Sequence, residues 1–157
     1  MDKTPENNTD TEINSVPALE FLEKEGFFSV STKGVSMMPM LRDGIDTVII
    51  NRKEDRLQKY DVAFFRRGKS LVLHRVIKVL PEGYIIRGDN CIGYDKVAED
   101  DVLGVLTLFV RGKKQISVLD SSYRIYSRLI VFFYPVKKAV FRVRKTAVKI
   151  LKKLGIK

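Results

Sequence analysis

Four side chains in the central part of the sequence have the chemistry of a serine hydrolase. Ser36 lies in "KGVSMMPML", and His74, the only histidine, lies in "LVLHRVIKV". Asp89 and Asp95 follow in "RGDNCIGYDK". A serine hydroxyl needs a base to take its proton, an imidazole titrates near neutral pH, and a carboxylate can hold the imidazole tautomer. Ser36 and His74 are therefore a candidate nucleophile and base, and either aspartate is a candidate partner of His74.

The residues around Ser36 predict a bend in the backbone. Gly34 suits a turn conformation that other residues avoid, and Pro39 interrupts a strand. Such a bend would lift Ser36 out of a sheet and let nearby amide N–H groups point at a developing oxyanion. One such donor stabilises a transition state by about 3 kcal/mol. Taken singly, however, a serine in a turn and a histidine on a strand are more often structural.

The elements that must position these residues are mostly strands. A short helix is expected between Pro17 and Gly26, and residues 88–96 read as a loop. Because helices do not alternate with the strands, a parallel α/β fold is disfavoured. On the strand that carries His74, Leu71 and Leu73 should face the core on the opposite side. The predicted fold is mainly β, with short antiparallel strands at 27–31, 46–51, 61–65, 70–80, 84–87, 101–110 and 115–119.

Composition predicts one domain with tails. Residues 1–16 are polar and expected to be disordered, 17–120 form the catalytic β domain, and 121–157 form a basic helical tail. Cys91 is the only cysteine, so no intramolecular disulfide can form. No signal peptide and no run of 18 apolar residues is visible. These features predict a cytoplasmic protein or one peripheral to the cytoplasmic membrane face, and no spacing or glycine-rich loop suggests a metal or cofactor.

The net charge of +10 is concentrated in the tail. Residues 121–157 hold eleven Lys and Arg and no acidic residue, which leaves 18 basic and 19 acidic residues before them. Apolar residues recur there at helical spacing, which predicts a basic amphipathic helix. The helix could pack on the body, bind a partner or lie on an anionic membrane; the apolar stripe argues against nucleic acid. The candidate membrane contacts are Lys137, Lys138, Arg142, Arg144, Lys145, Lys149, Lys152 and Lys153.

The order of these motifs resembles the type I signal peptidases. "GVSMMPML" is similar to their serine box, "DVAFF" to the following box, and "LVLHRVIKV" to the segment that carries His-Arg-Val in archaeal and endoplasmic-reticulum enzymes. "IIRGDNCIGYDKV" is similar to their Gly-Asp-Asn box, and "VLGVL" to their closing strand. The resemblance covers roughly residues 30–110. It implies the signal-peptidase/LexA-like β-fold and cleavage of extended peptides after small residues.

Carried over by position, the resemblance assigns roles to individual residues. Ser36 matches the nucleophile, His74 the general base, and Asp95 the acid that orients the histidine. The supporting residues around them would be Asp89, Asn90, Gly34, Val35, Met37 and Pro39.

Departures from the family pattern favour a specialised peptidase that trims a leader or precursor peptide. Tyr60 stands where the family has glycine, Met40 replaces a common threonine, and no membrane anchor precedes Ser36. Two alternatives remain. One is a non-catalytic peptide-binding module of the same fold. The other is a self-cleaving regulator similar to LexA-like repressors, although these use a lysine base and an N-terminal helix-turn-helix.

Overall fold

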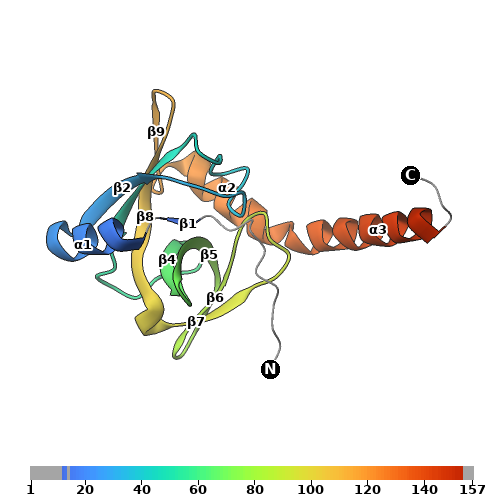
Figure 1. Cartoon of the computed structure of the whole chain (residues 1–157), viewed down its shortest axis with the longest axis horizontal. Helices are drawn as coiled ribbons and strands as arrows, with labels where there is room; N and C mark the ends of the chain where they lie inside the picture. The colour runs from blue at the N-terminus through green and yellow to red at the C-terminus, as the bar shows by residue number, and fades with distance from the viewer. Residues whose placement is uncertain (1–11, 14, 154–157) are drawn as a thin grey trace.

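One antiparallel sheet that curls on itself forms the body of the protein (Figure 1). The computed structural model describes residues 12–13 and 15–153. The strands are ordered β2-β3-β8-β4-β5-β6-β7, while β1 pairs with β5 and β9 with β8. The fold class predicted from the sequence is confirmed, because the protein is mainly β with a short N-terminal helix and C-terminal helices.

The elements follow one another along the chain, and the connection between Ser31 and Thr47 carries Ser36. A single 3-10 turn, Glu99–Asp101, leads into β8. The strands and helices are β1 (Glu12–Ile13), α1 (Ser15–Glu25), β2 (Phe27–Ser31), β3 (Thr47–Arg52), β4 (Val62–Arg67), β5 (Ser70–Leu80), β6 (Gly83–Arg87), β7 (Asp95–Ala98), β8 (Val102–Arg111), β9 (Lys114–Ser117), α2 (Ser121–Phe132) and α3 (Tyr134–Lys153).

Two local predictions were wrong. The loop expected at 88–96 ends early, because β7 begins at Asp95 and pairs with β6. In β7 only Val97 is buried, so the strand lacks the apolar run that would have identified it. Residues 12–13 form β1, and α1 begins at Ser15, so disorder is not found there. Residues 1–11 and 14 of the expected disordered segment lie outside the described residues.

The two faces of β5 enter different hydrophobic clusters. Leu71 and Leu73 pack with α1, with the turn that contains Ser36 (the serine turn) and with Tyr123 of α2. Val72 and Val76 pack inside the curl formed by β4 to β7. Because side chains alternate across a strand, His74 shares the face of Val72 and Val76. The prediction that Leu71 and Leu73 face the core opposite His74 is confirmed.

Of the two helices in the tail, α2 packs on the body and α3 extends away from it. Tyr123 and Ser127 of α2 are buried against the sheet, so packing extends beyond the boundary expected at residue 120. α3 then runs outward from the body (Figure 1). Its apolar residues Val136, Val140 and Val143 are exposed, so this stripe does not pack on the body. Within the described residues, no helix combines the length and apolar character needed to cross a membrane.

Candidate active site

Ser36 lies in a turn held by backbone hydrogen bonds. Gly34 has φ of +100°, a conformation that strongly favours glycine, and its N–H donates to Asp43 Oδ1 at 2.7 Å. The Met38 N–H donates to the Val35 carbonyl at 3.1 Å, which closes the turn around Ser36. The bend predicted from Gly34 and Pro39 is therefore present.

A buried carboxylate supports the far end of this turn. Asp46 accepts hydrogen bonds from Arg42 Nη2 at 2.7 Å and from Arg111 Nη2 at 3.1 Å. Arg111 also donates to the carbonyl oxygen of Met40. Burial alone would raise the pKa of Asp46, but the hydrogen bonds from Arg42 and Arg111 hold that pKa below its usual value. The turn is thus tied to β8 through charged contacts.

The Gly-Asp-Asn loop holds the other side of the serine turn. The Asn90 N–H donates to the Ser36 carbonyl at 2.7 Å, and Asn90 Nδ2 donates to the Val35 carbonyl at 3.2 Å. These contacts join segments more than 50 residues apart in sequence. Asn90 therefore positions the backbone that carries Ser36.

His74 lies on β5 with one ring nitrogen directed at Asp95. Its Nδ1 is 3.3 Å from Asp95 Oδ2, and its ring centroid is 5.9 Å from that of Phe65. Arg67 Nη1 lies 3.4 Å from the same Asp95 oxygen. An Nδ1–H that faces a carboxylate leaves Nε2 with the lone pair of the neutral imidazole, as a general base requires.

Gly88 locates the second ring nitrogen beside the serine turn. A Cβ atom added to Gly88 would lie 3.0 Å from His74 Nε2, 2.7 Å from the Ser36 carbonyl oxygen and 2.8 Å from Cys91 Sγ. Nε2 and the Ser36 backbone therefore both border the space that this missing side chain leaves. The structure brings together Ser36, His74 and Asp95, the three residues predicted as the reacting set.

Asp89 belongs to a different network. It forms a two-point ion pair with Arg75, in which both N–O distances are 2.7 Å. Tyr126 also donates to Asp89, and burial followed by the nearby Asp89 charge raises the pKa of Tyr126. Arg75 Nη1 further donates to Ser127 at 2.9 Å. Asp89 thus joins the loop to β5 and α2, whereas Asp95 contacts His74.

The beginning of α3 rests on the same loop. Lys137 Nζ donates to the Asp89 carbonyl at 2.8 Å and lies 3.3 Å from Asn90 Oδ1. Burial lowers the pKa of this ammonium group. The Tyr134 hydroxyl donates to the carbonyl of Ile92. Lys137, predicted as a membrane contact, is instead half-buried on the body.

The other predicted membrane contacts lie farther along α3. Arg142 and Arg144 are exposed, and Lys138 is half-buried. Four more have helical backbone, but their side chains fall outside what the structure describes: Lys145, Lys149, Lys152 and Lys153.

Tyr60, which stands where the signal peptidases have glycine, adopts an unusual backbone conformation. Of the described residues other than glycine, it alone has a positive φ, which is +85°. Its carbonyl accepts from Arg75 Nη1 at 2.9 Å, and its N–H donates to the Val76 carbonyl at 2.9 Å. The conformation at this position is thus one that glycine adopts without strain.

Sequence reasoning missed three neighbours of the site. Cys91 Sγ lies beside Gly88, Arg67 pairs with Asp95, and Lys137 holds the loop. Cys91 could have been noticed because it follows Asn90 directly. The other two contacts depend on how β4 and α3 are placed against the loop, and no local pattern indicates this.

One edge of β5 is paired with two other segments of the same chain. β6 pairs with β5 from Arg75 onward, and β1 pairs with Leu71 and Val72, which precede Arg75 on the strand. Since β4 occupies the opposite edge over these residues, β1 and β6 share one edge. Ser36 and His74 are 1% and 2% exposed, so both residues are buried by their neighbours in this structure.

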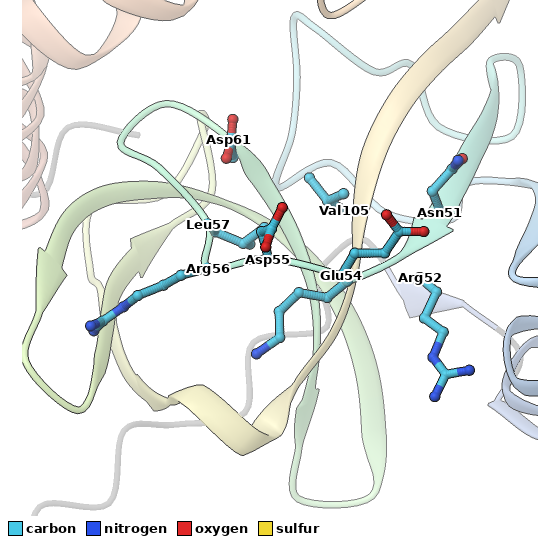
Figure 2. A pocket seen from close by; sticks show the side chains of 9 residues that line it. Asn51, Arg52, Glu54, Asp55, Arg56, Leu57, Asp61 and Val105 are labelled. Atoms are coloured by element: carbon cyan, nitrogen blue, oxygen red, sulfur yellow. The ribbon is translucent and has the colours of Figure 1, made fainter.

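The surface pocket shown in Figure 2 lies in another part of the body. It is formed by the β3–β4 connection and its neighbours, and Ser36 and His74 do not line it. Two of its cations, Lys53 and Arg56, pair with Glu99. Its mixed charges and internal pairing do not indicate a catalytic centre. The lining residues are Asn51, Arg52, Lys53, Glu54, Asp55, Arg56, Leu57, Asp61 and Val105.

Comparison with known proteins identifies no family. No protein-family model matches the chain, and no curated protein is a significant sequence relative.

Proposed function

We propose that the protein is a serine endopeptidase in which Ser36 is the nucleophile and His74 the general base. The observation that carries this proposal is the position of the His74 ring. Its Nδ1 faces Asp95, and its Nε2 borders the same space beside Gly88 as the Ser36 backbone. This arrangement gives each ring nitrogen a separate role in proton transfer.

In the proposed reaction, Ser36 Oγ attacks the carbonyl carbon of a peptide bond while His74 Nε2 takes the hydroxyl proton. The tetrahedral intermediate collapses as the C–N bond breaks, and the imidazolium gives that proton to the leaving amine. Water then attacks the acyl ester with His74 again as base, and Ser36 recovers a proton. Asp95 stabilises the imidazolium formed in each half of the reaction.

The proposed substrate is a leader or precursor peptide bound in an extended conformation. Extended peptides commonly add to the free edge of a sheet, where backbone hydrogen bonds supply affinity. The pairing of β1 with Leu71 and Val72 supports this mode, because that edge accepts a strand two and three residues before His74. Cleavage after small residues and action at the cytoplasmic membrane face are part of the proposal from the resemblance to signal peptidases.

The decisive experiment separates Ser36 from its neighbour Cys91 as the nucleophile. Purified wild type, Ser36→Ala, His74→Ala and Cys91→Ala would be incubated with peptides that contain small residues, in detergent. Cleavage should be lost in the first two variants and kept in Cys91→Ala. Equal cleavage by wild type and Ser36→Ala would reject the mechanism. If wild type binds peptides but none is cut, the protein is a peptide-binding module.

One observation favours a second candidate, a self-cleaving regulator. The chain's own residues 12–13 lie on the edge where a substrate is proposed to bind. Intact-mass measurement of wild type and Ser36→Ala distinguishes the two functions. A shortened wild-type chain beside a full-length variant would indicate self-cleavage, whereas two full-length chains favour a separate substrate.

A further inference from the structure

An exposed apolar row follows α2 and α3 on one side. We call it the outer stripe, and its members are spaced by three or four residues, as one face of a helix requires. Their side chains are between 48% and 74% exposed. The outer stripe consists of Ile125, Leu129, Phe132, Val136, Val140 and Val143.

The outer stripe is continuous across the junction of the two helices. The Phe133 N–H donates to the Leu129 carbonyl at 2.9 Å, and the Lys137 N–H donates to the Phe133 carbonyl at 3.1 Å. These bonds have the i to i−4 spacing of a helix, and the departure from helical backbone is confined to Phe133, whose ψ is 2°. Figure 1 shows α3 leaving the body beyond α2.

The opposite side of α2 and α3 makes the contacts with the body. Tyr123 and Ser127 are buried on the sheet, while Tyr134 and Lys137 bond to the loop beside Ser36. At 3.6 residues per turn these four residues lie about 100° or more from the centre of the outer stripe. The outer stripe therefore faces away from the body.

The charge beside the outer stripe has a single sign. Residues 121–157 contain no acidic side chain. Arg128, Arg142 and Arg144 are exposed on the described part of the two helices. An apolar row whose charged neighbours on these helices are all cations matches a surface that is apolar below and anionic at its boundary, as a bilayer with anionic headgroups is.

We propose that the outer stripe docks on an anionic lipid bilayer. The valines and Phe132 would enter the boundary between headgroups and acyl chains, and the arginines would contact the headgroup phosphates. A second copy of the chain is a poorer occupant, because two such faces would bring rows of like charge together. Nucleic acid would satisfy the cations and leave the apolar row in water.

Docking would place the proposed active site close to the lipid. Lys137 and Tyr134 hold the loop whose Asn90 binds the Ser36 carbonyl. Ser36 would thus stand above the surface by about one helix diameter, ~10–12 Å, plus this loop. If Ser36 is the nucleophile, as proposed above, the favoured substrate is a peptide segment that emerges from or lies on a membrane.

The binding experiment is independent of catalysis because it uses the full chain with Ser36→Ala. Sedimentation with vesicles would compare phosphatidylcholine alone with phosphatidylcholine that contains phosphatidylglycerol. Binding should require the anionic lipid and weaken at least ~10-fold when Val136→Glu and Val140→Glu are combined, since an apolar contact is lost and negative charge is added. Glutamate favours helix more than valine does, so α3 should persist in circular dichroism spectra.

A matched control carries the same two added charges elsewhere. Ile45 and Leu119 are exposed apolar residues outside the outer stripe. A chain with Ile45→Glu and Leu119→Glu should bind anionic vesicles within about twofold of the parent. Equal binding by the stripe variant and this control, equal binding to neutral vesicles, or no vesicle binding would overturn the proposal. So would a dimer in sedimentation velocity that the stripe variant alone abolishes.

The substrate class has its own test in the Ser36-containing protein. The same peptide would be offered free in solution and tethered to phosphatidylglycerol-containing vesicles through a lipid. The tethered form should be cut faster by wild type, and the stripe variant should lose this advantage while cleaving the free peptide normally. Lipid binding without any Ser36-dependent cleavage would reject the proposed function and leave the docking surface intact. Equal rates on both peptides would reject only the membrane-bound substrate class.

Discussion

His74 Nδ1 and Asp95 Oδ2 lie 3.3 Å apart, although β6 separates the strands that carry them. Asp89 is only six residues from Asp95, but its carboxylate pairs with Arg75. The two aspartates of one motif therefore serve different neighbours on β5. One contacts the proposed base, and the other anchors the next residue along the strand.

Substituting each aspartate should separate these roles. Asp95→Asn should lower kcat by up to about 10⁴-fold, because an amide in this position favours the wrong imidazole tautomer. Its unfolding midpoint in urea should change little. Asp89→Asn should destabilise the fold by about 3 kcal/mol, because Arg75 keeps a buried, uncompensated charge. Peptide cleavage and urea unfolding measured on both variants check the prediction, and the opposite pattern would contradict it.

Gly88→Ala should disrupt the candidate active site, because the space beside Gly88 has no room for a methyl group. The new methyl group would lie 2.7 Å from a backbone oxygen of the serine turn, and this oxygen cannot move without moving Ser36. We expect cleavage to fall at least ~100-fold, since a displacement of about 1 Å can cost this much. Gly93→Ala in the same loop is the matched control, because its Cβ would meet no atom within 4 Å. Similar activity in both variants would show that the close packing at Gly88 is unimportant.

Replacing residues 1–14 with a Gly-Ser segment of equal length should increase peptide cleavage. The replacement removes β1, which pairs with β5 at Leu71 and Val72. If substrates use this edge, KM should fall several-fold while kcat stays near its original value. Steady-state kinetics with one defined peptide measure this directly. An unchanged KM would mean that β1 and the substrate occupy different places.

Stability should depend on acid through Asp46. The pKa of Asp46 is lowered on folding from a reference value of 3.8, so its stabilising effect is present above that value. The effect is lost as the pH falls through the lower pKa of the folded state. Asp46→Asn should reduce stability by about 1.5–3 kcal/mol at neutral pH. In urea unfolding at several pH values, the difference between wild type and variant should shrink below pH ~4; a constant difference would contradict the assignment.

Strands with strong local signals were predicted well from the sequence. β2 and β5 match the expected ranges, and alternation along β5 placed Leu71 and Leu73 correctly. β7 and β1 were missed because they are short and gain their hydrogen bonds from distant strands. Pairing of this kind depends on the fold as a whole and leaves little trace in the local sequence.

For the candidate site, motif order predicted which residues meet, but not their networks. Ser36, His74 and Asp95 lie in one region, and the Gly34 bend is present. Sequence spacing could not assign Asp89 to Arg75, because that contact depends on a side chain from the opposite face of β5. It also could not show that Lys137 binds the loop, since this requires α2 to fix the direction of α3.

The pairing of β1 with β5 has a consequence for selectivity. A segment joined to the body by a short connection competes at an effective concentration in the millimolar range, whatever the amount of protein. A peptide that uses the same edge must exceed this threshold by its own affinity or by local accumulation. Dilute peptides in bulk solution would fall below it, whereas peptides gathered in two dimensions on a surface could reach it. Competition from β1 would then select for substrates that are locally concentrated and against substrates that are dilute.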